Sequence, residues 1–235
     1  MLAICFDADG TLFHSTTSVG DLWRAFCSER HCVVSSEEAT AIAGSVGARF
    51  HQRWLHLWDA KLGRTIGEDA EDGFWLEYNA AVLANWGLAE HAHEALRWFN
   101  RVEPDNTAAL YDDTVPALRT LAERKVTMAV YSNRLTSIVP TLRRLGVADF
   151  FAWVRSAGDT GIAKPNSEAF RMVADALGVS MASLAYVGNS VTEDYHGARS
   201  AGCQSILIDR ARRHQSETGL LVIHSLLDIP TRLRV

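Results

Sequence analysis

The chain contains several short apolar runs in which apolar and polar residues do not alternate. A strand with one solvent-exposed face alternates, so continuous apolar runs indicate strands that are buried on both faces. Segments with helical periodicity separate the runs, and this order predicts an α/β fold, a parallel sheet with helices on both faces. The runs cover residues 2–6, 126–131, 150–154, 184–187 and 205–208.

Two of the connecting segments carry a helical pattern. Apolar residues recur at helical spacing between residues 135 and 145, and again between residues 170 and 177. Gly178 directly follows the second pattern, and glycine often ends a helix because it adopts left-handed backbone angles without steric cost. We therefore expect amphipathic helices in both segments, packed against the sheet.

A long stretch from residue 14 to residue 109 interrupts this alternation. It contains no strand-like run, and it holds six of the seven tryptophans. We expect an all-helical unit at 14–109, inserted after the first strand into a core that comprises residues 1–13 and 110–235. The tryptophans are interpreted as the internal packing of this unit rather than as ligand-stacking residues. They are Trp23, Trp54, Trp58, Trp75, Trp86 and Trp98.

The charge of the chain argues against several kinds of partner. The 235 residues include 23 basic and 28 acidic side chains, which gives a net charge of −5. Such a chain has no general attraction to nucleic acid or to anionic membranes. One short basic cluster, Arg210, Arg212 and Arg213, is interpreted as solvated surface. We therefore expect a small-molecule ligand, no nucleic acid and no membrane.

The four cysteines do not form a metal or redox motif. They are scattered and no Cys-x-x-Cys occurs, so a zinc site or a dithiol pair has little support. Cys27 and Cys32 are close enough in sequence for a disulfide, but two reduced thiols are the preferred interpretation. The apolar run at 2–6 is too short for a signal peptide or a membrane span. These features predict a cytoplasmic protein.

Polar residues follow four of the predicted strands. The carboxyl ends of parallel strands share one edge of the sheet, and ligands of open α/β sheets bind at this edge. Each residue type is common in turns, but their joint occurrence at four strand ends favours one shared pocket. The residues are Asp7, Asp9, Ser132, Asn133, Lys164, Asn189 and Asp194.

The chemistry of these residue types points to phosphoryl transfer. Paired carboxylates raise each other's pKa unless a cation lies between them, and their oxygens suit a hard ion such as Mg²⁺. A carboxylate beside such an ion, here Asp7, can attack phosphorus and form an aspartyl-phosphate. The carboxyl of Asp9 can protonate the leaving oxygen and then activate water. Ser132 can hold phosphoryl oxygens, and Lys164 can offset negative charge.

Simpler interpretations remain open for single residues. Asp194 alone could cap the helix that follows it. His91 and His93 lie two residues apart in a predicted helix, so they do not share a face and are interpreted as solvated. The chain has neither of the common glycine-rich nucleotide-binding motifs, so a nucleotide cofactor has no support.

In their order along the chain, these residues resemble the four motifs of the haloacid dehalogenase-like (HAD) hydrolase superfamily. Residues 7–12, Asp-Ala-Asp-Gly-Thr-Leu, are similar to the first motif and Ser132 to the second. Lys164-Pro165 is similar to the third motif, and residues 188–194 are similar to the fourth. The likeness spans the whole predicted core. It implies a Rossmann-like parallel sheet with a helical C1 cap at 14–109.

The resemblance also implies a role for each residue. Asp7 would be the nucleophile, and Asp9 would be the general acid and base and would offer the metal its backbone carbonyl. Lys164 would steady Asp7 and the phosphoryl group. The phosphate-binding residues would be Ser132, Asn133 (through its backbone) and Lys164, and the Mg²⁺ ligands would be Asp7, Asp9, Asn189 and Asp194.

One residue departs from the family pattern. The family usually has an acidic residue at the position of Asn189, whose amide oxygen can ligate Mg²⁺ but brings no charge. We expect weaker metal affinity, with Asp194 taking a larger share directly or through water. An impaired or inactive family member is therefore kept as an alternative.

Three functions are compatible with the resemblance. The leading hypothesis is a Mg²⁺-dependent phosphatase, a hydrolase that cleaves a small phosphorylated metabolite through an aspartyl-phosphate. A 2-haloacid dehalogenase shares the nucleophile but needs no metal and no acid at position 9, so Asp9 argues against it. The third is a non-catalytic binding or regulatory protein, and Asn189 is the residue that favours it.

Overall fold

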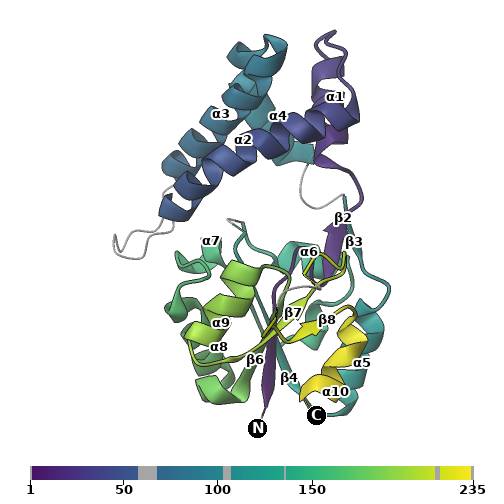
Figure 1. The fold of residues 1–235 in the computed structure, drawn as a ribbon, viewed down its shortest axis with the longest axis vertical. Coiled ribbons are helices and arrows are strands. Elements are labelled where there is room, and N and C mark those ends of the chain that lie inside the picture. The colour runs from purple at the N-terminus through teal and green to yellow at the C-terminus, as the bar shows by residue number, and fades with distance from the viewer. Residues whose placement is uncertain (1, 58–67, 103–106, 135, 215–217, 234–235) are drawn as a thin grey trace. The chain divides into compact units, whose positions relative to one another are not determined.

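The computed structural model describes residues 2–57, 68–102, 107–134, 136–214 and 218–233. The chain divides into two compact units, coloured by residue number in Figure 1. One unit comprises Met1–His14 and Ala109–Val235, and the other comprises Ser15–Ala108. Each unit is described by itself below.

The first unit contains a six-stranded parallel sheet with the strand order β5-β4-β1-β6-β7-β8. This confirms the predicted Rossmann-like α/β fold. Four of the five predicted strands lie close to their expected positions, and β8 was not expected. The strands are β1 (Ala3–Phe6), β4 (Thr127–Ser132), β5 (Trp153–Ser156), β6 (Leu184–Gly188), β7 (Gln204–Ile208) and β8 (Val222–Ile223).

Strand β1 lies at the centre of the sheet because every one of its side chains is apolar and fully buried. It pairs with β4 on one side and with β6 on the other. The register places Phe6 beside Val130 of β4 and Val187 of β6. The residues that follow Phe6, Val130 and Val187 therefore reach the same edge of the sheet.

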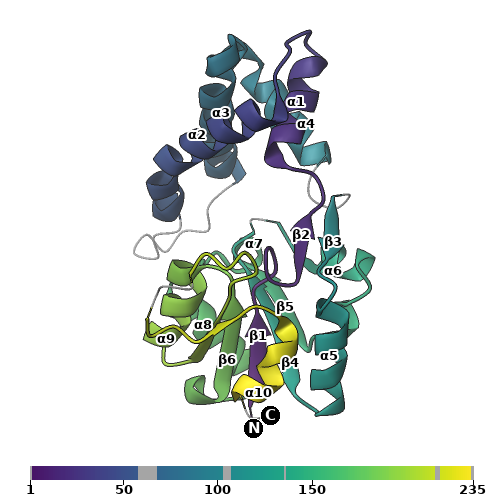
Figure 2. The same cartoon turned by 45° about the vertical axis from the view of Figure 1, so that its right-hand side comes forward.

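Helices cover both faces of the sheet. Figures 1 and 2 show α8 and α9 on one side of the strands and α5 and α10 on the other. The predicted helix at 170–177 is confirmed as part of α8, which ends at Gly178 with a φ of 66°. The helices are α5 (Thr114–Glu123), α6 (Val139–Arg144), α7 (Ala157–Thr160), α8 (Ser167–Leu177), α9 (Gly197–Ser200) and α10 (Ile229–Leu233).

Two local predictions for the first unit were wrong in detail. The strand expected at 150–154 begins later, as β5, because Ala148–Phe150 forms a turn of 3-10 helix before it. The helical pattern expected from residue 135 gives only the short α6, and residue 135 itself lies outside the described residues. Further 3-10 turns lie at Met181–Ser183 and Leu226–Asp228, and Val191–His196 is a π-helical turn.

The interpretation of Arg210 as solvated surface was also wrong. Its guanidinium lies 3.1 and 3.0 Å from the two carboxylate oxygens of Asp113, and it donates to the carbonyl oxygen of Thr11 at 2.7 Å. It also stacks on the ring of Tyr111, 3.6 Å from the ring centroid. These partners are distant in sequence, so no local pattern indicated them.

The expectation of no strand between residues 14 and 109 was wrong at both ends of this stretch. Strands β2 (Phe13–Ser15) and β3 (Ala108–Leu110) pair as a small two-stranded sheet. Each is only three residues long, which is too short for a recognisable alternation.

The second unit is helical within its described residues apart from the ends of this small sheet. Its aromatic side chains form a buried cluster in which Trp23 contacts Phe99 (ring centroids 4.5 Å apart) and Phe26 contacts Trp98 (5.8 Å). Its helices are α1 (Val19–Ser28), α2 (Ser36–Leu57), α3 (Glu68–Leu83) and α4 (Ala92–Val102), with 3-10 turns at Ala84–Trp86 and Ala89–His91.

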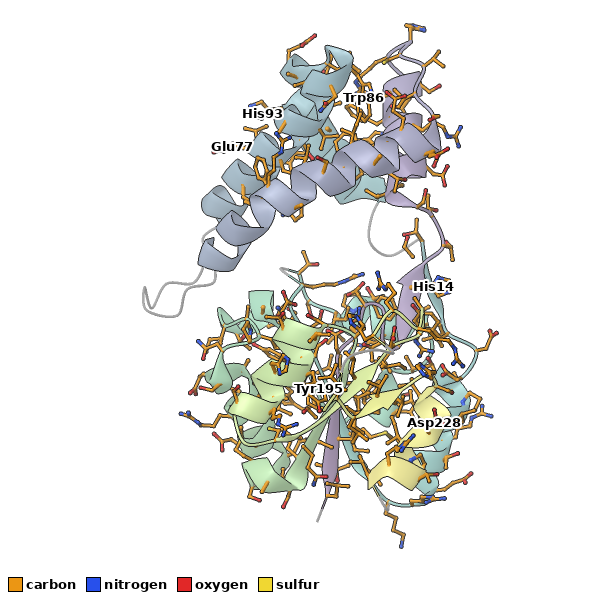
Figure 3. The ribbon with its side chains drawn as sticks, in the orientation of Figure 1. His14, Glu77, Trp86, His93, Tyr195 and Asp228 are labelled. Carbon is orange, nitrogen blue, oxygen red and sulfur yellow. The ribbon has the colours of Figure 1, made fainter. Side chains whose placement is uncertain are left out.

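The described tryptophans of the second unit pack against other aromatic side chains of the same unit. Trp86, labelled in Figure 3, packs against the buried cluster and donates from its indole N–H to Glu38 at 3.2 Å. The side chain of Trp54 and all of Trp58 lie outside the described residues. No helix in the described part of the chain is both long enough and apolar enough to span a membrane.

Candidate active site

The site lies at the carboxyl ends of β1, β4 and β6. The backbone N–H of Asp7 continues the sheet by donating to the carbonyl oxygen of Val187 at 2.8 Å. Ser132 is the last residue of β4, and Asn189 directly follows the last residue of β6. Because β1 lies between β4 and β6, the sheet brings together the three segments that the sequence predicted to share a pocket.

The loop after β1 is a tight turn that depends on glycine. Gly10 has a φ of 74°, in the region that favours glycine. A Cβ at this position would also lie 2.6 Å from one terminal atom of the Asn189 amide, so a larger residue would displace that amide. The turn places the hydroxyl of Thr11 3.2 Å from Oδ2 of Asp7, to which it donates a hydrogen bond.

Lys164 connects two carboxylates in the interior. Its Nζ lies 2.7 Å from Oδ1 of Asp7 and 2.8 Å from Oδ1 of Asp194, and its side chain is only 1% exposed. The side chain of Asn133 holds the backbone of Lys164 by two hydrogen bonds, from Nδ2 to the carbonyl oxygen (2.9 Å) and from the backbone N–H to Oδ1 (2.8 Å). The side-chain amide of Asn133 therefore positions Lys164. The backbone of Asn133 stays available for the predicted contact with phosphate.

This burial changes the acidity of both partners in the bridge. Burial raises the pKa of Asp7 to about 7, although the ammonium group of Lys164 acts to lower it. Burial acts to lower the pKa of Lys164, but Asp194 and Asp7 outweigh it and raise this pKa above its usual value. Lys164 is therefore a permanent cation beside the predicted nucleophile.

Asp194 is oriented by the π-helical turn at Val191–His196, which the sequence did not indicate. Its Oδ1 accepts from Lys164, and its Oδ2 accepts from the backbone N–H of Ser190 at 2.9 Å. The carboxylate packs against Gly188, where a Cβ would lie 2.3 Å from Cγ of Asp194. Ser190, rather than Asp194, caps this turn, by accepting from the N–H of Glu193. A direct role of Asp194 as metal ligand stays a prediction.

The side-chain amide of Asn189 lies close to two oxygens at this edge, one from Asp7 and one from Asp9. One terminal atom of the Asn189 amide lies 3.0 Å from the carbonyl oxygen of Asp9 and 3.2 Å from Oδ2 of Asp7. If this atom is nitrogen, the amide donates two hydrogen bonds; if it is oxygen, three oxygens face one another. Adjacent ligands of an octahedral Mg²⁺ ion are separated by about 3 Å, because each lies 2.0–2.1 Å from the metal.

The candidate Mg²⁺ site cannot be recognised as a cluster of acidic side chains, because only one of its oxygen donors is a carboxylate. Among the described residues, no group of three or more His, Cys, Asp or Glu side chains is arranged to hold a metal. The convergent set instead combines one carboxylate, one backbone carbonyl and one amide, all of them hard oxygen donors. Asp7, Asp9 and Asn189 thus fit Mg²⁺, with one formal negative charge among the three facing atoms.

The structure adds a residue that sequence reasoning missed. Arg134 forms a bidentate ion pair with Asp9, with Nε 2.8 Å from Oδ2 and Nη2 2.6 Å from Oδ1. Its backbone N–H donates to Oγ of Ser132 at 3.2 Å, and a hydroxyl that accepts can still donate its own proton. The only signal in the sequence was the position of a basic residue directly after Ser132 and Asn133.

Comparison with known proteins shows the family to which the chain is similar. A family model described as haloacid dehalogenase-like hydrolase matches residues 1–202. A phosphoserine phosphatase of Thermus thermophilus is 30% identical over 191 residues, 71% of this chain and 73% of that protein. A phosphoglycolate phosphatase of Pectobacterium atrosepticum is 26% identical over 204 residues, 86% of this chain and 78% of that protein.

Solved structures share the fold across the whole chain. The putative HAD-hydrolase YfnB from Bacillus subtilis, described as bound to magnesium, has a TM-score of 0.73 at 18% identity and covers 100% of this chain and 99% of its own. A 2-haloacid dehalogenase from Pseudomonas syringae pv. Tomato has a TM-score of 0.64 at 22% identity, with the same two coverages. At these identities the likeness shows the fold only, and it does not discriminate between a phosphatase and a dehalogenase.

Proposed function

The chain belongs to the haloacid dehalogenase-like hydrolase family, and we propose that within it the protein is a Mg²⁺-dependent phosphatase of a small phosphomonoester. The observation that carries this proposal is the position of the Asn189 amide, one terminal atom of which lies 3.0 Å from the carbonyl oxygen of Asp9 and 3.2 Å from Oδ2 of Asp7. An amide oxygen at this place would have the spacing to both oxygens that adjacent Mg²⁺ ligands have. The two phosphatases to which the chain is similar in sequence support the same reaction class.

In the first half-reaction, a carboxylate oxygen of Asp7 forms a bond to phosphorus while the bond between phosphorus and the ester oxygen breaks. The leaving oxygen takes a proton from Asp9, so that an alcohol departs and an aspartyl-phosphate remains. Ser132 and the backbone of Asn133 bind phosphoryl oxygens. Lys164 keeps Asp7 oriented through the 2.7 Å contact and balances the charge that builds on the phosphoryl group.

In the second half-reaction, Asp9 accepts a proton from water, and the water oxygen attacks phosphorus. The bond between phosphorus and Asp7 breaks, which releases inorganic phosphate and restores both carboxyl groups. Bound Mg²⁺ would neutralise charge on the phosphoryl oxygens and lower the repulsion between substrate and Asp7. The residues that would hold it are Asp7, Asp9 and Asn189, with Asp194 directly or through water.

The wider setting of the reaction belongs to the same proposal. The helical unit Ser15–Ala108 is proposed as the cap that selects the substrate, because it is inserted directly after the predicted nucleophile loop. The substrate is proposed to be a small phosphorylated metabolite in the cytoplasm. Four free cysteines, Cys5, Cys27, Cys32 and Cys203, support a reducing compartment.

The test is hydrolysis of an aryl phosphate by the purified protein across a Mg²⁺ titration. We expect turnover that requires Mg²⁺ and falls at least about 1,000-fold in Asp7→Asn, because the covalent step is lost. Asp175→Asn makes the same chemical change on the exposed face of α8 and should retain wild-type turnover. Turnover that persists without Mg²⁺ or in Asp7→Asn would contradict the proposal.

The same preparation discriminates the two alternatives. Release of chloride from 2-chloropropionate without metal would identify a dehalogenase, a reaction for which the acid at position 9 is not needed. Binding of phosphate esters without turnover, with or without Asn189→Asp, would indicate a non-catalytic protein.

A further inference from the structure

Arg134 and Asp9 form a bidentate ion pair at the edge of the candidate site. Asp9 is half exposed (49%), whereas the Arg134 side chain is only 19% exposed. Both guanidinium bonds to Asp9 are short, at 2.6 and 2.8 Å, and together they occupy the fork of the carboxylate. The structure therefore shows Asp9 with both oxygens engaged by a cation.

This arrangement conflicts with the role proposed for Asp9. To protonate the ester oxygen, Asp9 must carry a proton on an oxygen that lies within hydrogen-bond distance of it. Arg134 has to give up at least one of its two bonds before that oxygen can take this position. The guanidinium N–H groups that are released then need a new acceptor, because a largely buried charged donor without a partner is costly.

Arg134 is anchored so that it stays beside Asp9 after release. Its backbone N–H donates to Oγ of Ser132, and its carbonyl oxygen accepts from the N–H of Gly158 at 3.0 Å. Its guanidinium lies over the ring of the buried Phe13, 5.4 Å from the ring centroid. The new acceptor must therefore come to Arg134, and a group on the bound substrate can take this position.

We propose that Arg134 binds a carboxylate on the alcohol part of the substrate and exchanges Asp9 for it. In the proposed reaction Asp9 faces the ester oxygen, so the guanidinium beside Asp9 faces the leaving alcohol rather than the phosphoryl group. A substrate carboxylate offers the same pair of oxygens that Asp9 offers now. The preferred substrate is then a phosphomonoester with a carboxylate close to the ester oxygen. This inference rests on the proposed phosphatase function.

The experiment compares two esters of similar size, carboxymethyl phosphate and 2-hydroxyethyl phosphate, at saturating Mg²⁺. For the wild type we expect kcat/KM to be at least about tenfold higher for the carboxylated ester. In Arg134→Gln this preference should fall to about one, through a loss of about 10- to 100-fold on carboxymethyl phosphate, the range for a hydrogen-bonded charge pair. Arg134→Lys, which keeps the charge but not the fork, should give an intermediate preference.

The ratio of the two kcat/KM values within one preparation does not depend on the fraction of folded protein. Arg143→Gln makes the same change on the exposed end of α6 and should keep the wild-type ratio. A wild type without preference, or an Arg134→Gln variant that slows both esters by the same factor, would overturn the inference. If Arg134→Gln is inactive on both esters, an unchanged ratio in Arg134→Lys overturns it and a reduced ratio supports it.

Failure of this inference is distinguishable from failure of the proposed function. Mg²⁺-dependent turnover of an aryl phosphate without preference between the two alkyl esters would overturn the role of Arg134 and leave the phosphatase standing. Absence of Mg²⁺-dependent turnover of all three esters would overturn both.

Discussion

At the scale of single residues, the site is governed by which atoms face Asp7. Lys164 satisfies Oδ1 of Asp7 with a permanent positive charge. The amide of Asn189 can face Oδ2 with either its nitrogen or its oxygen. If the nitrogen faces Asp7, the amide donates hydrogen bonds to Asp7 and Asp9 in place of a cation. If the oxygen faces Asp7, the amide can serve as an uncharged ligand of Mg²⁺. We therefore propose that this amide stabilises the site without a metal and serves as a ligand when Mg²⁺ binds.

Asn189→Asp tests this role directly. The carboxylate cannot donate to Asp7 and Asp9, so we expect the free energy of unfolding without metal to fall by about 1 kcal/mol. The added charge should strengthen Mg²⁺ binding by roughly tenfold, because ligand charge sets the affinity of such sites. Thermal unfolding in chelator and calorimetric Mg²⁺ titration measure the two effects.

Gln204→Glu is the matched control, because it converts an exposed amide into a carboxylate at the start of β7. It should leave Mg²⁺ affinity unchanged. An unchanged affinity in Asn189→Asp as well would show that position 189 does not contact the metal.

At the scale of elements, strand ends and the turns after them position the chemistry. Strand β1 is buried on both faces, so its end is fixed between β4 and β6. The π-helical turn after β6 directs Asp194 back toward Lys164, and this return is possible because Gly188 has no side chain. Lys164 is thus held from two places, by Asp7 directly after β1 and by Asp194 in the turn after β6.

Gly188→Ala should disturb this turn. A Cβ there would lie 2.3 Å from Cγ of Asp194, so the carboxylate must move away from Lys164. We expect a loss of about 2 kcal/mol in the free energy of unfolding, the usual range for overpacking, together with reduced kcat. Denaturant unfolding and aryl phosphate turnover measure these effects.

Gly44→Ala is the corresponding control, since a Cβ at this position of α2 meets no atom within 4 Å. It should stabilise the protein by up to about 1 kcal/mol, because alanine is the better helix former. Wild-type stability in Gly188→Ala would mean that Asp194 can relax without loss.

At the scale of the whole molecule, one ion pair ties distant segments of the sheet unit together. Asp113, at the start of α5, accepts from Arg210 after β7, and also from the hydroxyl of Ser225 and the N–H of Leu226. Arg210 in turn donates to the carbonyl oxygen of Thr11 in the loop after β1. The pair therefore connects the last third of the chain to the loop that contains Asp7.

Asp113→Asn should lower the free energy of unfolding by about 3 kcal/mol at pH 7, because it leaves a largely buried guanidinium without its counter-charge. Burial acts to raise the pKa of Asp113, but hydrogen bonds from Arg210, Ser225 and Leu226 outweigh it and hold this pKa below its usual value. A lowered pKa stabilises the folded state above the unfolded pKa of about 3.9, and this contribution disappears as the pH falls through the folded value.

The difference in the free energy of unfolding between wild type and Asp113→Asn should therefore be constant near neutral pH and shrink below about pH 4. Chemical denaturation as a function of pH measures it. Glu168→Gln removes an exposed partner of Arg171 and should change stability by less than about 1 kcal/mol at every pH. A pH-independent difference for Asp113→Asn would show that the charge of Asp113 does not contribute.

The fold class and the segments that meet at the site could be predicted from local patterns in the sequence. Buried strands need continuous apolar runs, and helices on a sheet need apolar residues at 3.6-residue spacing, so both are visible in local order. The parallel sheet then places the ends of neighbouring strands together, which is why Asp7, Ser132 and Asn189 could be assigned to one edge before any contact was known.

The contacts between these side chains, in contrast, became known from the folded structure. The pairing of β2 with β3, the ion pairs of Arg134 with Asp9 and of Arg210 with Asp113, and the bridge from Lys164 to Asp194 join residues that lie far apart in the chain. Spacing along the sequence carries no information about such contacts, because distance in space and burial set their strength, and the packing of the whole sheet fixes both.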